Sequence, residues 1–445
     1  MYTSLLTPGR FGSTLRRFVE DRSGSFIITV GLLMPVLAGM MGLAVENAYW
    51  YTHQRNMQNA SDAAAIAAAT NASGNYVAEA RAVAAQLGFT DGQGNVSVTV
   101  TNPGTATGCA SSCYVVQIVD AVPLYLSQLV GYKGTAKINN KGMTLITATA
   151  AATSATAYSY CVLALASSGA QGITANGVPE PDLNGCNVMS NTTAVCNGHN
   201  LNATFGDAHQ TNEGCGITQA SNVPAVSDPY AGLATNIPSD TCGGTYPTEP
   251  AKKKDPALPD ANKWSGSYTL SGNYVVCGDQ QLIGTTTINA ADGAVLVIEN
   301  GQLDTNGYTL QTADGSSLAI VFTGANNAGY QHVPSGGGTL DITAPTSGPW
   351  SGVAIYQDPN LTTNVDVSAA GNSPTWNISG LVYLPHSSVT FSGAVNKSSR
   401  GSYCFAMVVD NITINGTGNI FANDNQCSSA GLTLPRGGHR GTLVN

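Results

Sequence analysis

The chain has 445 residues, enough for two or three domains, and only 10% of them are charged. Gly, Ala, Thr, Asn and Ser dominate, as in exported β-rich bacterial proteins, whereas a typical soluble domain carries about a quarter of charged residues. The formal net charge of −9 and the lack of a basic stripe argue against nucleic acid as a partner. No arginine occurs between Arg81 and Arg400, so this region has few means of binding phosphates or carboxylates bidentately.

An uncharged apolar segment runs from Phe26 to Val45. At about 1.5 Å per residue, roughly 20 residues cross a hydrocarbon core of about 30 Å, so we expect a transmembrane helix over residues 25–46. Four arginines precede this segment: Arg10, Arg16, Arg17 and Arg22. This excess predicts that residues 1–24 form a cytoplasmic tail and that the rest of the chain is translocated across the membrane. A cleaved secretory signal is the alternative. The segment is longer than a usual signal core, and no clean small-x-small cleavage site follows it.

All ten cysteines lie beyond the predicted span: Cys109, Cys113, Cys161, Cys186, Cys196, Cys215, Cys242, Cys277, Cys404 and Cys427. An even number on the exported side predicts disulfides in an oxidising compartment. The connectivity does not follow from the sequence. The short spacing of Cys109 and Cys113 suggests a local pair, and Cys404 and Cys427 suggest a second.

Residues 47–157 predict a small α+β unit next to the membrane. Alanine-rich helical signals continue past the span, a second helical segment follows, and then the apolar pattern changes to the period of two that is typical of strands. The expected elements are helices at Asn47–Thr70 and Tyr76–Phe89, strands at Asn95–Thr101 and Tyr114–Val119, a short helix or turn, and a strand at Lys141–Ala155.

The remaining sequence consists of short apolar runs separated by turn residues, which predicts a mainly β protein. We divide it into a Cys-containing β region (158–244), a Pro- and Lys-rich linker or long loop (245–263), repeated strand–turn–strand segments (264–434) and a tail (435–445). Repeats at about 20 to 30 residues indicate a right-handed β-solenoid. A Greek-key sandwich also has many short strands and is the alternative.

The N-terminal segment resembles the TadE/TadG-like proteins of tight-adherence (Flp) pilus assembly. The matching features are a glycine before the apolar span, Pro35 inside it, the acidic Glu46 at its end, and an amphipathic helix with the run Gln-Asn-Ala-Ser-Asp-Ala-Ala-Ala-Ile-Ala at residues 58–67. The resemblance covers residues 24–70, and the strand region that follows is similar to TadG-like members. It implies a single-pass protein of the bacterial inner membrane with a periplasmic body that serves pilus biogenesis. Thr29 stands where prepilin-peptidase substrates carry Glu, so we expect the N-terminal tail to remain.

The candidate membrane and assembly residues all lie on the N-terminal helix. Pro35 is expected to bend the helix, and Ala38 with Gly42 forms a small-xxx-small pair of the kind that packs helices in membranes. Glu46 marks the end of the span and could pair with a basic residue of a partner. The family run and its small residues supply the other candidates: Gln58, Asp62, Ala64 and Ala68.

The sequence gives no support for a metal, a cofactor or catalysis. Cys196, His199, His209 and Cys215 fit no standard zinc spacing, and oxidised cysteines do not bind metal. The turns at Asp91–Asn95 and Asp304–Gly307 lack the spaced carboxylates of an EF-hand. No paired-carboxylate or nucleophile motif accompanies Asp341, Asp358, Asp366 and Asp410, so we predict a protein that is not an enzyme.

The sequence therefore predicts a membrane-anchored structural protein that acts by oligomerisation and by contacts with pilus-assembly or envelope proteins. The alternative is a surface adhesin, or a polysaccharide-binding or polysaccharide-cleaving solenoid, that shares the anchor. Four aromatic residues could stack on carbohydrate in that case, although core packing explains them equally well: Trp350, Tyr356, Trp376 and Tyr383.

Overall fold

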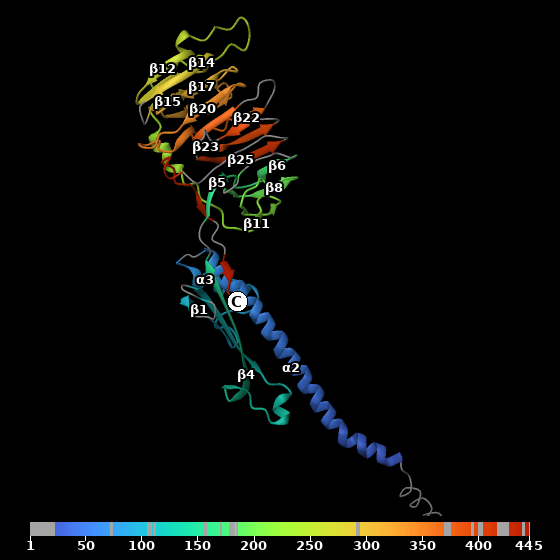
Figure 1. Cartoon of the computed structure of the whole chain (residues 1–445). Helices are drawn as coiled ribbons and strands as arrows, with labels where there is room; N and C mark the ends of the chain where they lie inside the picture. Colours follow the sequence, from blue (N-terminus) through green and yellow to red (C-terminus); the bar gives the residue numbers. More distant parts are fainter. Residues whose placement is uncertain are drawn as a thin grey trace, which may run out of the picture. The chain divides into compact units, whose positions relative to one another are not determined.

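The computed structural model describes residues 23–71, 74–104, 109, 113–154, 158–169, 171–177, 183, 186–290, 294–368, 375–392, 396–398, 404–415, 427–437 and 441–444. These residues belong to two compact units (Figure 1). Unit 1 takes in Met1–Ala155 and Arg440–Asn445, and unit 2 takes in Thr156–His439.

Unit 1 is built on one long helix, α2 (Ser23–Asn71), which runs without a break through the predicted span and the predicted alanine-rich helix. The second helix, α3 (Tyr76–Gln86), places Ala80 and Ala84 in the core that α2 also lines. Small side chains allow these helices to approach closely, because alanine adds little bulk and loses no rotamer freedom in a helix.

A five-stranded antiparallel sheet covers one side of α2. Its strands are β1 (Val96–Gly104), β2 (Cys113–Pro123), β3 (Ala136–Ile138), β4 (Lys141–Ser154) and β27 (Gly441–Leu443), in the order β1-β2-β4-β27, with β3 paired to the start of β4. The loop between β2 and β3 holds the short 3-10 helix η1 (Ser127–Val130). Because side chains alternate along a strand, Val116, Ile118 and Ala148 face the helix and are buried with it.

In the sequence, unit 2 lies between two strands that belong to the sheet of unit 1. The chain leaves β4 at Ser154 and returns in β27, where Gly441 pairs with Ser154. Within unit 2, the returning strand β26 (Arg436–Gly437) pairs antiparallel with the first strand, β5 (Tyr158–Ala164). The segment predicted as a tail therefore contributes one strand to each unit.

The other strands of unit 2 pair in parallel and form two stacks. The first stack contains β5, β6 (Gln171–Asn176), β7 (Asn187–Ser190), β8 (Thr193–Asn197), β9 (Phe205–Ala208), β10 (Asn212–Glu213), β11 (Thr218–Ala220), β13 (Asn273–Cys277), β15 (Ala294–Glu299), β18 (Leu318–Thr323), β21 (Val353–Gln357), β22 (Val365–Ser368), β23 (Thr375–Ser392) and β25 (Phe405–Asn415). The second contains β12 (Lys263–Leu270), β14 (Gln280–Ala290), β16 (Leu303–Asp304), β17 (Thr309–Thr312), β19 (Pro334–Ser335), β20 (Thr339–Thr343), the start of β23, and β24 (Asn396–Ser398).

Apolar residues are aligned from strand to strand through the first stack. Ile320 pairs with Leu296 on one side and with Ile355 on the other, and the series continues through Val382 to Met407. All five side chains are buried. Strands β15 and β18 are buried on both faces, which explains why their sequences are continuous apolar runs instead of alternating ones.

The order of the strands in space differs from their order in the sequence. The late strand β25 pairs with the early strands β5 and β6, at Met407 with Val162 and at Ile412 with Ile173. Strands β7, β9 and β11 extend the stack on the β5 side, and β23, β21, β18, β15 and β13 extend it on the other. Figure 1 shows the green early strands beside the red late ones.

Residues 221–262 connect the two ends of this arrangement and are attached to several strands on the way. They carry the 3-10 helices η2 (Ala231–Asn236) and η3 (Asp260–Asn262). Asp228 accepts a hydrogen bond from the hydroxyl of Tyr383 at 2.7 Å, and Cys242 forms a disulfide with Cys277. The segment predicted as a linker is thus part of a connection that lies along unit 2.

The mainly β class with an N-terminal apolar helix is confirmed. The parallel pairing of the strands in unit 2 is inconsistent with a Greek-key sandwich, whose neighbouring strands are antiparallel.

Candidate functional site: the membrane and assembly helix

The first half of α2 exposes an apolar surface. The large side chains that are more than half exposed there are Ile28, Leu32, Leu33, Met34, Val36, Leu37, Met40, Met41 and Val45. A soluble protein would bury such a series, whereas a bilayer would cover it. By length and composition α2 can cross a membrane, and the candidate segment is Val30–Thr70. Few residues in the most apolar stretch of this segment are buried inside the protein. Pro35 and Ala38 lie in this exposed part.

Glu46 ends the apolar surface and is only 4% exposed. Its carboxylate accepts hydrogen bonds from the backbone N–H groups of Tyr125, Leu126 and Ser127, at 2.8, 3.0 and 2.6 Å. Three donors to one carboxylate satisfy a buried charge without a cation. The structure therefore gives Glu46 hydrogen-bond partners within the chain, whereas the sequence suggested a carboxylate that marks the end of the span or pairs with a basic residue of a partner.

Gly42 allows the same loop to approach α2. A Cβ added at this position would lie 3.1 Å from Cδ1 of Leu126, which is closer than most real contacts. One member of the predicted small-xxx-small pair thus packs against the chain's own loop, while Ala38 remains exposed. The loop of residues 124–132, which we call the η1 loop, is held against the last turn of the predicted span.

The alanine face of the helix is buried against unit 1's own sheet. Ala64 and Ala68 have no exposed surface and share a core with residues of β2 and β4. Gln58 donates one hydrogen bond to Asp62 at 2.8 Å and one to the backbone oxygen of Thr149 in β4 at 3.0 Å. These family residues dock the helix on the sheet, so this face is not open to a partner subunit.

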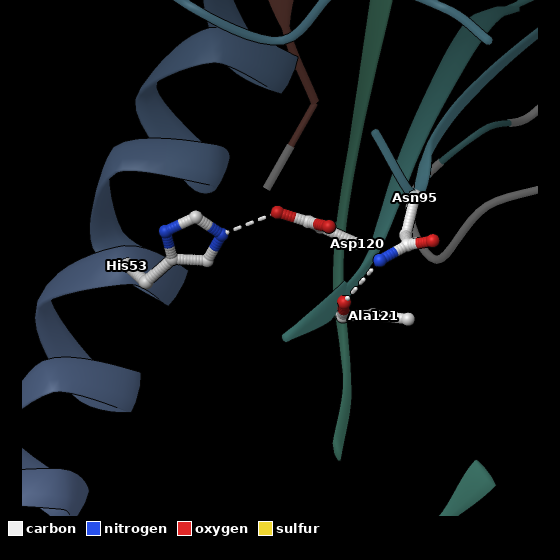
Figure 2. A network of polar contacts seen from close by, with 4 residues as sticks. All are labelled: His53, Asn95, Asp120 and Ala121. Carbon is white, nitrogen blue, oxygen red and sulfur yellow. Dashed lines mark hydrogen bonds and ion pairs between the residues drawn. The ribbon is translucent and has the colours of Figure 1, made fainter. Parts of the chain in front are cut away.

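A further polar contact joins α2 to the sheet (Figure 2). His53 Nε2 lies 2.8 Å from Asp120 Oδ2, and both side chains are less than a fifth exposed. Next to it, Asn95 donates to the backbone oxygen of Ala121 at 3.1 Å. The ring of Phe89 packs edge-on against His53 with centroids 5.6 Å apart. Sequence reasoning missed this pair, because no motif relates a helical histidine to an aspartate 67 residues away.

The ten cysteines form five disulfides: Cys109–Cys113, Cys161–Cys186, Cys196–Cys215, Cys242–Cys277 and Cys404–Cys427. They include both pairs that the spacing suggests. Cys196 and Cys215, the two cysteines of the stretch considered for zinc, are therefore bonded to each other. Among the described residues, no group of three or more His, Cys, Asp or Glu side chains could hold a metal ion.

Three of the four carboxylates considered for hydrolysis have hydrogen-bond partners within the chain. Asp341 accepts from Asn377 at 2.9 Å, and Asp358 accepts from Thr323 at 2.9 Å and from Asn360. The side chain of Asp410 accepts from Asn411 at 2.8 Å. The turn aspartates are similar: Asp91 accepts from the backbone of Val98 and ion-pairs with Arg81, and Asp304 accepts from Asn306 and Gln281.

Two carboxyl groups and one histidine of unit 2 have strongly shifted pKa values. Burial, with the carboxylates of Asp304 and Asp279 nearby, raises the pKa of Glu249 to about 7. Burial raises the pKa of Glu299 to about 7 as well, helped by two other aspartates. Burial lowers the pKa of His332 to about 4, which keeps that ring neutral. These shifts follow from packing inside unit 2.

The aromatic residues considered for carbohydrate stacking are buried. Trp350, Tyr356, Trp376 and Tyr383 are at most 4% exposed, and the rings of Tyr356 and Tyr383 stack on each other with centroids 5.1 Å apart. Their faces are therefore not available to a sugar. Core packing is the correct reading of these four residues.

Sequence reasoning also missed the exposed apolar η1 loop. Five large apolar side chains within residues 125–132 are exposed: Tyr125, Leu126, Leu129, Val130 and Tyr132. The signal was present in the sequence, since the segment at residues 124–132 is rich in large apolar residues and has no acidic one.

The fold and this helix define a protein with a helical membrane-anchor candidate, a small α+β unit docked on that helix, and a large parallel β body. Residues 24–72 match the family model of Flp pilus-assembly TadE/G-like proteins. The match falls on α2, which holds both the apolar segment and the residues that pack on the sheet. Neither a curated protein nor a solved structure matches the chain.

Proposed function

We propose that the chain is a membrane-anchored assembly component of a tight-adherence (Flp-type) pilus system. Its first residues would lie in the cytoplasm and its bulk in the periplasm, with α2 crossing the bacterial inner membrane. The observation that carries this proposal is the coincidence of the TadE/G-like match with a helix that is apolar and exposed at one end and packed on a sheet at the other.

Charge and cysteines support the proposed orientation. Four arginines precede the apolar segment, and the positive-inside rule retains such residues in the cytoplasm. All five disulfides form beyond the segment, as expected for a compartment that oxidises thiols.

We further propose that unit 2 is a right-handed β-solenoid. Its strands pair in parallel, and successive coils are offset in sequence as Asn273 is from Val295 or Ile320 is from Ile355. Parallel strands joined by crossovers are almost always right-handed. A solenoid offers a long side surface, so contacts with pilus or envelope proteins would form there. An experimental structure of unit 2 would test the handedness.

In this proposal the protein works through contacts and catalyses no reaction. The partners of Asp341, Asp358 and Asp410 support structural roles for these carboxylates. Polysaccharide binding remains the second candidate, because the parallel stacks of unit 2 suit an extended ligand. The four buried aromatic rings count against it.

Crosslinking in native membranes tests the proposal. The full chain with an affinity tag should capture pilus-assembly proteins. The matched control replaces residues 158–437 by a short turn, which the antiparallel pairing of Ser154 with Gly441 allows. It should keep unit 1 and lose the contacts made by the body. Recovery of no pilus-assembly protein with the full chain, together with saturable retention on envelope polysaccharide, would replace the proposal by the second candidate.

A reporter fused after Asn445 tests the orientation. We expect activity from a reporter that works only in the periplasm. Activity from a cytoplasmic reporter at this position would contradict the proposed topology.

A further inference from the structure

The η1 loop has the composition of a membrane-binding surface. Tyr125 is 62% exposed, Leu129 79% and Val130 56%, and no acidic residue occurs between Asp120 and Glu180. Exposed apolar residues clustered in a short segment usually mark an interaction site. Three lysines follow the loop within the next nine positions: Lys133, Lys137 and Lys141.

The loop is held next to the apolar surface of α2. Glu46 binds its backbone at three N–H groups, and Gly42 contacts the side chain of Leu126. Gly42 and Glu46 are one turn apart, about 6 Å along the helix. The exposed side chains of the loop therefore continue the apolar surface that ends at Val45, at the level where the predicted span leaves the hydrocarbon core.

Aromatic residues gather at the same level. Tyr49 and Tyr51 of α2 are 44% and 60% exposed, and the ring of Trp50 lies against that of Tyr132, with centroids 6.0 Å apart. Tyrosine and tryptophan are enriched where a membrane protein crosses the headgroup region, because their rings are apolar and their tips are polar. Two separate elements of unit 1 thus contribute to one aromatic belt.

Two of the three lysines lie at the base of the η1 loop. Lys133 and Lys137 line a hollow of about 310 Å³ at the base of the loop, together with Leu124, Gln128 and Tyr132. No acidic side chain lies within ion-pair distance of these lysines in the part of the chain that the structure describes. Basic residues beside an inserted apolar segment attract anionic lipid headgroups.

We infer that the η1 loop is a second membrane contact, which inserts Leu129 and Val130 into the leaflet on the side where α2 leaves the bilayer. The occupant of this surface is the lipid bilayer. The loop would restrict the tilt and rotation of α2, because Glu46 fixes it to the helix. This inference rests on the proposed membrane anchoring of α2.

The test places one fluorophore on the full chain in lipid nanodiscs of phosphatidylcholine and phosphatidylglycerol. Because the ten native cysteines are paired, Leu129→Cys provides a single thiol for an environment-sensitive dye. Leu443→Cys is the matched control: it is an exposed leucine of the same unit, on the strand that contacts Thr70. Thr70 is about 36 Å along α2 from Glu46.

We expect a blue-shifted emission at Leu129→Cys and at least fivefold stronger quenching by nitroxide-labelled lipid than at Leu443→Cys. Equal quenching by aqueous iodide at both positions would overturn the inference. Disulfide-linked dimers through position 129 in the bilayer would also overturn it, since a second copy would then cover the loop. Flotation of the unlabelled chain with liposomes is measured in parallel. Loss of flotation refutes the anchoring itself, whereas flotation with a water-exposed position 129 refutes only the loop contact.

Discussion

Substitution of Glu46 by Gln tests whether one carboxylate holds the η1 loop on α2. The carboxylate accepts three backbone N–H groups, and a hydrogen bond to a charged acceptor contributes about 1.5–3 kcal/mol. The contributions do not add fully, because the amide oxygen of Glu46→Gln can keep one of the three bonds. We therefore expect local opening of the loop to become easier by about 3 kcal/mol, or roughly a hundredfold in the opening equilibrium.

Hydrogen exchange of the full chain in nanodiscs measures this effect. Amides of residues 125–127 should lose about a hundredfold protection in Glu46→Gln, while amides of β2 and β4 should keep theirs, since the loop is outside the core shared by α2 and the sheet. Asp62→Asn is the matched control, as it removes a carboxylate of the same helix that binds Gln58 instead of the loop. Protection of residues 125–127 within threefold of the unsubstituted chain would show that Glu46 does not hold the loop.

Three further predictions concern the helix face, a buried carboxyl and a disulfide. Ala64→Leu should destabilise unit 1 by about 1–3 kcal/mol, because the added side chain overpacks a buried position. The control Asn59→Leu, at an exposed position of the same helix, should destabilise it by less than about 0.5 kcal/mol. Urea unfolding in micelles measures both, and equal losses of stability would contradict the buried face. Because the pKa of Glu299 is about 7 in the folded chain and 4.5 in the reference state, the folded chain keeps a proton that the unfolded chain releases, so its stability falls as the pH rises from about 4.5 to about 7. Glu299→Gln should remove that loss of stability: the variant should be more stable than the unsubstituted chain by about 1–2 kcal/mol at pH 8, after allowance for solvent screening, and equally stable at pH 4. Thermal unfolding at both pH values measures this difference. A stabilisation that is independent of pH would argue against a protonated carboxyl. Loss of the Cys404–Cys427 disulfide should cost about 3 kcal/mol, and Cys404→Ala with Cys427→Ala together should cost little more than either alone; additive losses would mean that they are not partners.

The helices and strands of unit 1 could be predicted from local patterns. Alanine-rich sequence and the period of two describe α2, β2 and β4 correctly because both depend on residues that are near one another in the chain. The role of Glu46 could not be predicted, since its three donors belong to a loop about 80 residues later. The same limit applies to His53, whose partner Asp120 is on a distant strand.

For unit 2, the apolar runs predicted strands, and their spacing suggested repeated coils. The spatial order of the strands was not predictable. The pairing of Met407 with Val162 joins two runs that resemble every other run in the chain, so composition alone cannot select the neighbour. Burial of Tyr356 and Tyr383 was equally hidden, because an aromatic residue in a strand has the same sequence signature on either face.

The insertion of unit 2 between β4 and β27 has a consequence for folding during synthesis. Residues 405–415 supply the strand that pairs with β5, and residues 441–443 supply the edge strand that pairs with β4. Both sheets therefore present an unpaired edge until these late residues leave the ribosome, and open edges invite association with other chains. A nascent chain that stalls before residue 405 would expose two such edges at once, which makes it a natural substrate for chaperones and proteases.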